Sequence, residues 1–179
     1  MSRVLAGLIV FALLLSGCGG EASFPADDMA IYKTGNKKKV VRYGMSRVEA
    51  EKVLGEEEKP SGDGYLYDSG VAIFYRDDKV AGIRLDKESK KTFQTKNIKI
   101  GMLEDDVKKK YGNITMAVAP LSLDYYYDTL TKKFLDDPMS LPKSQEGKEN
   151  IYIISNTIDE SGSVECIYLF DLKMALYGK

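Results

Sequence analysis

The chain has 179 residues, with 26 lysines and arginines, 27 aspartates and glutamates, and no histidine. A formal net charge of −1 lacks the overall basic character expected of a protein that binds nucleic acid or an anionic membrane surface. Without histidine, the chain has neither the commonest general base nor the commonest metal ligand. The composition therefore argues against a nucleic-acid partner, and the sequence offers no catalytic or metal-binding set of residues.

The first eighteen residues have the order of an export signal. Residues 1–3 are a short positive start, residues 4–15 are apolar or glycine, and the small residues Ser16 and Gly17 precede Cys18. This order is typical of a signal peptide. The twelve residues of the apolar run are too few for a membrane-spanning helix, which needs about 20. The segment therefore predicts export rather than a permanent membrane helix.

The four residues from Leu15 to Cys18 resemble the lipobox of bacterial lipoproteins, whose cysteine receives a diacylglyceryl group with palmitate-like chains. The resemblance implies that residues 1–17 are a signal peptide, that Cys18 is the lipidation site, and that this covalent lipid is the only cofactor. Two acyl chains are enough for stable anchoring. We therefore expect the protein at the bacterial cell membrane, or at the outer membrane if the host has one. The alternative is a chance cysteine beside an ordinary signal peptide.

Residues 18–28 are predicted to form a lipidated tether, because residues 19–28 combine glycine, serine and proline without any periodic pattern. Ten extended residues span at most about 33 Å, which keeps the folded part close to the membrane. Once Cys18 is lipidated, Cys166 is the only thiol left, so no intramolecular disulfide can form. Without a histidine to activate it, Cys166 is expected to be a half-buried strand residue rather than a nucleophile.

The segments 41–55 and 98–112 match each other at a constant offset of 57 residues, with Gly-Met near the start and Gly at the end of both. Each predicts a short helix. Ser46 is expected to cap the first helix, with Glu49 three residues later completing a capping box. Leu103 is a poor cap, so the second helix is expected to begin less firmly. Both helices are expected to end at a glycine in the left-handed conformation.

Strands are predicted after each helix, because runs of β-branched and aromatic residues alternate with turn residues. A first set of strands is expected at 65–68, 71–75 and 79–85, and a second at 123–128, 151–156 and 164–170. Shorter strands are expected before the helices, at 30–33, 38–42 and 92–100. These elements predict a first helix-and-meander repeat over 29–90 and a second over 91–179. The second contains an insert at 129–150, which is expected to be loosely ordered or functional.

Gly-Met, a short helix ending in Leu-Gly or Tyr-Gly, and a following β-meander resemble the outer-membrane assembly lipoproteins of the SmpA/OmlA type. In tandem, the pattern is similar to the β-lactamase-inhibitor-protein fold. The sequences of both copies are most similar to uncharacterised lipoproteins of Gram-positive bacteria. The resemblance implies an α+β fold of two tandem repeats, each a helix plus an antiparallel meander. It also implies a role in protein contacts rather than catalysis.

The alternation of side chains along strands predicts a binding surface. Ile83, Leu85 and their counterparts Ile167 and Leu169 are assigned to the helix-covered face, so the residues between them lie on the opposite face. Tyrosine is enriched at binding interfaces, although it also simply favours strands. The predicted partner-binding residues on this second face are Tyr65, Tyr67, Arg84, Tyr125, Tyr127 and Tyr168.

The sequence therefore favours a non-enzymatic protein-interaction module that is held at the cell envelope and binds an envelope or secreted protein. One alternative is a small-ligand receptor or envelope enzyme that uses the 129–150 insert. Such a protein would need a concave pocket with converging polar groups. A structural spacer without a specific ligand is the other alternative.

Overall fold

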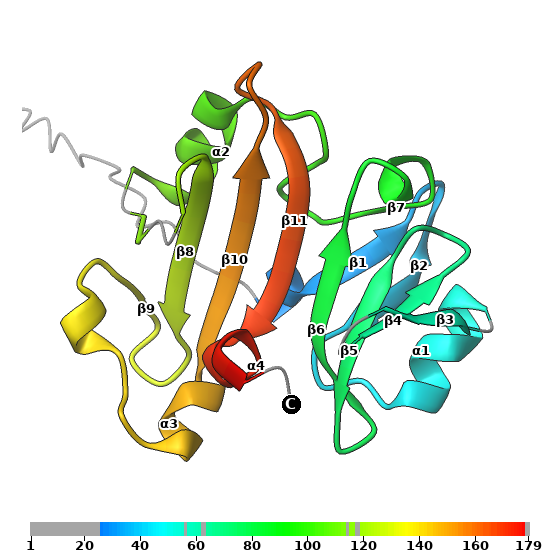
Figure 1. The fold of residues 1–179 in the computed structure, drawn as a ribbon, viewed down its shortest axis with the longest axis horizontal. Coiled ribbons are helices and arrows are strands. Elements are labelled where there is room, and N and C mark those ends of the chain that lie inside the picture. The colour runs from blue at the N-terminus through cyan, green and yellow to red at the C-terminus, as the bar shows by residue number, and fades with distance from the viewer. Residues whose placement is uncertain (1–25, 56, 62–63, 114, 117–118, 178–179) are drawn as a thin grey trace, which may run out of the picture.

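A computed structural model describes residues 26–177, except 56, 62–63, 114 and 117–118. The predicted signal peptide 1–17, Cys18 and residues 19–25 lie outside the described residues. The described part is an α+β fold with two antiparallel sheets and four α-helices, as Figure 1 shows. The predicted fold class is confirmed at this level.

Both predicted helices are present as α1 (Arg47–Leu54) and α2 (Glu104–Tyr111). The helices α3 (Gln145–Glu149) and α4 (Leu172–Tyr177) and three short 3-10 helices were not predicted. The 3-10 helices are η1 (Ala26–Met29), η2 (Ser89–Lys91) and η3 (Pro138–Ser140).

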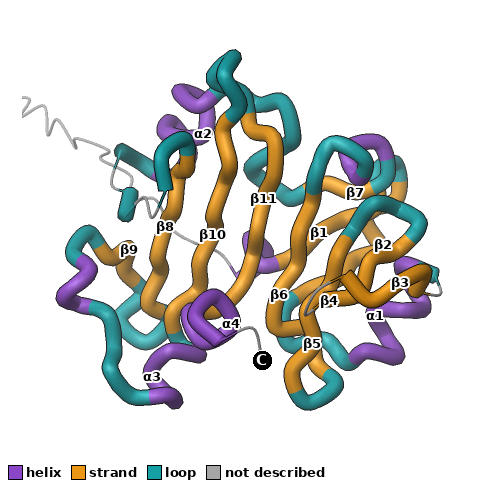
Figure 2. Tube along the Cα trace, in the orientation of Figure 1, coloured by secondary structure: helices purple, strands orange, loops and turns teal. Residues whose placement is uncertain are grey.

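The larger sheet has eight antiparallel strands in the order β3-β4-β5-β6-β11-β10-β8-β9. Its strands are β3 (Glu57–Ser61), β4 (Gly64–Tyr67), β5 (Ala72–Arg76), β6 (Lys79–Leu85), β8 (Ser122–Asp128), β9 (Lys133–Leu135), β10 (Ile151–Ile158) and β11 (Val164–Asp171). The six strands predicted after the helices are all present. The unpredicted β3 and β9 form the two edges of the sheet (Figure 2).

The smaller sheet has the order β2-β1-β7, with β1 (Ala30–Lys33), β2 (Asn36–Arg42) and β7 (Phe93–Gln94). The prediction of a strand over 92–100 is correct only for the two residues of β7. The small sheet, α1 and α2 lie behind the large sheet in Figure 1, whereas α4 crosses in front of it. Because β1 pairs with β7, the N-terminal hairpin β1–β2 contacts the segment that connects β6 to α2.

One hydrophobic core extends under both halves of the large sheet. It includes Ile31 of the small sheet, Ala50 of α1, Val107 of α2, and Ile73 and Ile167 of the large sheet, all with 0% of their surface exposed. Because one cluster contains residues from both halves, the two halves share their main core.

The turn that leads into α1 is fixed by backbone hydrogen bonds to the start of β6. The Gly44 amide donates to the Val80 carbonyl at 2.8 Å, and the Val80 amide donates to the Met45 carbonyl at 2.8 Å. The Arg47 amide, at the first position of α1, donates to the Asp78 carbonyl at 2.8 Å. These bonds hold the N-terminus of α1 against the large sheet.

The same three bonds occur at α2, with β11 in place of β6. The Gly101 amide donates to the Val164 carbonyl at 2.7 Å, and the Val164 amide donates to the Met102 carbonyl at 2.8 Å. The Glu104 amide donates to the Gly162 carbonyl at 2.9 Å. Each bonded residue in the turn before α2 lies 57 positions after its counterpart before α1, which is the offset found in the sequence. Each bonded residue at or just before the start of β11 lies 84 positions after its counterpart at β6.

The two helices differ at their N-termini as predicted. Ser46 accepts a hydrogen bond from the Glu49 amide, and the Glu49 side chain accepts from the Ser46 amide, which is a complete capping box. Leu103 makes no side-chain capping bond, and its side chain is 54% exposed. Acidic residues in the first turn of α2 and lysines in its last turn complement the helix dipole and offset the missing cap.

Both helices end at a glycine with a positive φ, 97° at Gly55 and 91° at Gly112. Their ψ angles, −171° and 178°, differ from the predicted left-handed helical cap. This conformation is almost exclusive to glycine. In it, the chain leaves the helix in an extended direction rather than folding back over the last turn.

We predict opposite effects of two capping substitutions. Ser46→Ala removes a capping box and should lower the free energy of unfolding by about 1 kcal/mol, whereas Leu103→Ser supplies a missing cap and should raise it by about 0.5 kcal/mol. Urea unfolding of both variants provides the measurement. A loss of stability in Leu103→Ser would show that the exposed leucine contributes more than a cap does.

A buried ion pair joins the two halves at the lower end of the sheet in Figure 1. Asp171, with a fully buried side chain, pairs with Arg76 at 2.5 Å and accepts a hydrogen bond from the Tyr43 hydroxyl at 2.5 Å. It also accepts a bond from the Met174 amide at 2.7 Å, which caps the start of α4. Burial and the contact with Asp171 raise the pKa of Tyr43. One carboxylate therefore holds residues of both halves and the C-terminal helix.

Asp171→Asn should lower the free energy of unfolding by about 3 kcal/mol, because it leaves the buried Arg76 charge with only a long contact to Glu149 at 3.9 Å. Chemical denaturation measures the loss. Glu165→Gln is the matched control, since its partner Lys87 is 62% exposed and the pair is solvated. The control should change stability by less than about 1 kcal/mol. Equal losses in both variants would contradict the importance of the buried pair.

Candidate binding surface

The register of the strands decides which face each predicted binding residue occupies. Antiparallel partners lie side by side on the same face. Arg84 pairs with Tyr168 across β6 and β11, between the buried pairs of Ile83 with Leu169 and Leu85 with Ile167. As predicted, Arg84 and Tyr168 therefore lie on the face opposite the core, which we call the front face.

The other four predicted tyrosines lie on the helix-covered face, so their expected place in an open surface is wrong. Tyr65 pairs with Ile73, which pairs with the core residue Ile83. Tyr125 pairs with Ile154 of the core. The side chains of Tyr67, Tyr125 and Tyr127 are 1%, 1% and 9% exposed, and Tyr65 is half-buried.

Tyr65 and Tyr125 contact the two helices that cover this face. The guanidinium carbon of Arg47 in α1 lies 4.2 Å from the centre of the Tyr65 ring. In the second half, the Tyr111 ring of α2 packs on Tyr125 at 5.3 Å, and Phe134 of β9 packs on Tyr127 at 5.4 Å. The sequence could not assign their face, because Leu66 and Tyr126 between them are apolar too and the strands show no alternation.

The front face is narrower than predicted because part of it is covered. A second apolar cluster is formed by Tyr126, Ile151, Ile153 and Leu172, with Leu141 and Leu135 of the 129–150 insert packed against it. The Met174 side chain of α4 lies against Gly82, because a Cβ added at this glycine would be 3.4 Å from it. The insert, expected to be loosely ordered, contains β9, η3 and α3 and covers β8 and β10.

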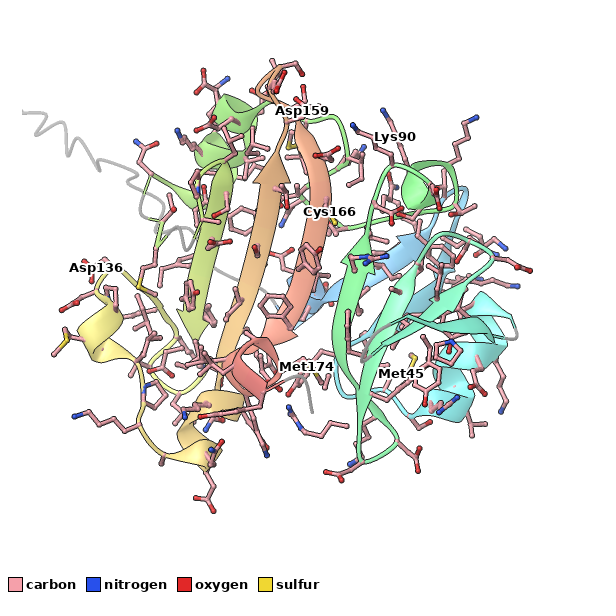
Figure 3. All side chains as sticks on the ribbon, viewed as in Figure 1. Met45, Lys90, Asp136, Asp159, Cys166 and Met174 are labelled. Atoms are coloured by element: carbon pink, nitrogen blue, oxygen red, sulfur yellow. The ribbon has the colours of Figure 1, made fainter. Side chains whose placement is uncertain are left out.

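A shallow depression of about 470 Å³ remains uncovered where β6 and β11 diverge beyond their last paired residues, Leu85 and Ile167. Cys166 lies at this place in Figure 3. We call it the junction depression, because both halves contribute to it. Its lining residues are Arg84, Asp86, Lys87, Glu88, Glu165, Cys166 and Tyr168.

The Arg84 guanidinium is incompletely paired. Its Nη2 lies 3.6 Å from Asp86 Oδ2 with 28% of the side chain exposed, which is a long and partly solvated contact. Its Nε is buried and has no hydrogen-bond acceptor among the described residues. A buried donor without a partner costs about 1–3 kcal/mol. The exposed part of the guanidinium, rather than the buried Nε, provides the donors that a bound molecule can reach.

Cys166 is not set up as a nucleophile. It lies on β11 and is half-buried, as predicted. Its Sγ is 3.0 Å from the Leu85 carbonyl oxygen, to which the thiol donates. Burial raises the pKa of the Cys166 thiol and that of the adjacent Tyr168 hydroxyl. Both groups therefore stay protonated near neutral pH and can act as hydrogen-bond donors.

Within the described residues, no three Cys, Asp or Glu side chains are grouped so that they could hold a metal ion. The helices of this part of the chain are all too short or too polar to cross a membrane. No protein family model, no curated protein and no solved structure matches the chain. The resemblance to SmpA/OmlA-type lipoproteins therefore stays a prediction.

An alkaline titration tests the placement of the tyrosines. Burial raises the pKa of Tyr125 to about 12, whereas an unfolded tyrosine ionises near pH 10. The folded state keeps this proton to a higher pH than the unfolded state does. The contribution of Tyr125 to the free energy of unfolding should therefore fall by about 2 kcal/mol as the pH rises from 10 to 12. Tyr125→Phe should flatten this part of the stability curve.

Tyr177→Phe is the matched control. The Lys148 ammonium donates to the Tyr177 hydroxyl at 2.7 Å and lowers the pKa of Tyr177. The control should therefore remove the tyrosinate absorbance that appears at the lowest pH. It should leave the loss of stability between pH 10 and 12 unchanged. An unchanged slope in Tyr125→Phe would place Tyr125 in solvent and contradict its burial.

Proposed function

We propose that the protein is a bacterial envelope lipoprotein, anchored through Cys18, that binds an envelope or secreted protein at the junction depression without catalysing a reaction. The anchor rests on the lipobox-like order of residues 15–18. The binding role rests on one observation above the others. Among the described residues, Arg84 has only a long, partly solvated ion pair and a buried Nε without an acceptor, at the uncovered part of the front face where the two halves meet.

In this proposal the binding module consists of two tandem copies of one helix-and-meander unit, residues 29–90 and 91–179. The equal sets of backbone hydrogen bonds around α1 and α2 support a duplication. So does the pairing of β6 with β11, which are equivalent strands in the two units. The tandem arrangement is the feature that resembles the β-lactamase-inhibitor-protein fold.

The chemistry of the junction depression favours a polar protein segment as the ligand. Arg84 and Tyr168 offer donors, while Asp86 and Glu165 offer acceptors, all beside one another. Alternating donors and acceptors match the amide and carbonyl groups of a peptide backbone. The 129–150 insert, which a receptor or enzyme would use, packs Leu135 and Leu141 on the sheet instead. This packing favours the depression over the insert.

The proposal can be tested in cells by photocrosslinking from position 168. A photoreactive phenylalanine in place of Tyr168 should yield a discrete protein adduct in the membrane fraction. Arg84→Glu should lower the yield of the adduct about tenfold or more, because it replaces a positively charged hydrogen-bond donor with a negatively charged carboxylate. Cys18→Ala should move the chain from the membrane into the medium, since the acyl chains are lost.

The same probe at Leu130, which is 72% exposed and lies in the β8–β9 turn, is the matched control and should give no adduct. A probe at Met139, which is 86% exposed, reports on the insert. An adduct at Met139 alone would transfer binding to the insert and contradict the proposal. Retention of Cys18→Ala in the membrane fraction would contradict the lipid anchor.

A further inference from the structure

The basic residues of the chain are unevenly distributed, which the net charge of −1 conceals. The segments 33–42 and 90–99 contain nine lysines and arginines and no acidic residue. The remaining residues have 17 of the 26 basic side chains and all 27 acidic ones. About one ninth of a nearly neutral chain is therefore strongly positive.

The two positive segments lie side by side in the small sheet. β1 pairs with β7 through Lys33 opposite Phe93 and Tyr32 opposite Gln94. The Thr34 amide of the β1–β2 turn donates to the Thr92 carbonyl at 2.8 Å. Segments separated by about fifty residues in sequence thus form a single surface.

All nine side chains are exposed, and we call this region the basic surface. It consists of Lys33, Lys37, Lys38, Lys39, Arg42, Lys90, Lys91, Lys96 and Lys99. Figure 3 shows Lys90 pointing away from the body of the molecule at the side that bears β7. Among the described residues, the only ion pair that any of the nine makes joins Lys96 to Asp27 at 3.2 Å. Most of the positive charge is therefore available to a ligand.

The basic surface adjoins the place where the predicted tether enters the fold. Asp27 lines a depression of about 330 Å³ together with Lys37, Lys96 and Lys99. The next residue, Asp28, is 2% exposed and accepts a hydrogen bond from the Asn97 side chain at 2.7 Å. The start of the fold is thus fixed beside the lysines. Seven residues lie between Cys18 and Ala26, and the eight steps from one to the other span at most about 28 Å when extended.

We propose that the basic surface rests on the anionic phospholipid headgroups of the membrane that holds the lipid anchor. This inference builds on the proposed anchoring through Cys18 and adds an orientation to it. Lysines near an anionic leaflet are attracted to it within a Debye length, about 10 Å at 0.1 M salt. The tether allows the surface to come within that distance and limits its separation from the anchor to about 28 Å. The small sheet then faces the lipid, and the front face on the other side of the core faces away from it.

Lysine labelling of the full chain on vesicles tests this orientation. Protein purified with its N-terminal modification is added to vesicles of phosphatidylcholine alone, or with about 30% phosphatidylglycerol as the anionic lipid. An amine-reactive reagent and mass spectrometry then report the labelling of each lysine. Lys38, Lys90 and Lys91 should react about threefold or more slowly on the anionic vesicles, and about 0.5 M NaCl should abolish this protection.

Two triple variants with the same change in charge provide the control. Replacing Lys37, Lys38 and Lys39 by Glu should remove the protection of Lys90 and Lys91. Replacing Lys132, Lys133 and Lys143 by Glu should leave it unchanged, because these exposed lysines lie in the β8–β9 turn and the insert. Loss of protection in both variants would indicate only a dependence on net charge and would overturn the proposed surface.

The outcomes separate this inference from the anchor. The mass of the Cys18 peptide from the same sample reports acylation. Acylated protein whose lysines label equally on both vesicle types would overturn the basic surface and leave the anchor intact. Protection without acylation would support the surface and remove the anchor. Protection in cells that anionic vesicles do not reproduce would indicate an acidic protein as the ligand and would overturn the proposal.

Discussion

The pairing of β6 with β11 is the interaction on which the rest of the structure depends. It joins two meanders into one sheet and places Ile83 and Leu85 beside Leu169 and Ile167 in a shared core. Without it, each half would have a single helix on a small sheet, with exposed edges and too little apolar burial for independent stability. The buried pair of Arg76 with Asp171 closes the same junction from its lower end. A binding surface made by both halves exists only because this junction is formed.

The similarity of the halves was visible in the sequence because it rests on local chemistry. A Gly-Met turn, a capped helix and a terminal glycine are short-range signals, and α1 and α2 begin and end where those signals predict. The six meander strands followed from β-branched and aromatic runs between turn residues. Tyr65 and Tyr125 are corresponding residues of the two halves. Both occupy the same face of the sheet, although not the face that was expected.

What the sequence could not show depends on long-range contacts. Strands such as 65–67 and 125–127 are apolar on both sides, so only the helices packed above them decide which face is covered. β3 has no apolar alternation, and β9 has three residues. α4 begins only because Asp171 caps it while pairing with Arg76 from the other half. The basic surface, too, requires the pairing of β1 with β7, since the net charge of the chain gave no indication of it.

The described residues are therefore expected to form one cooperative unit, with a basic surface beside Asp27 and a polar depression where the two halves meet. Native-state hydrogen exchange tests the cooperativity most directly. Because the halves share a core, the slowest amides of β5 and β6 and those of β10 and β11 should exchange with one free energy of opening, equal to that of global unfolding. A first half that opens several kcal/mol more easily than the second would show two separate units, and the β6–β11 junction would lose its central place.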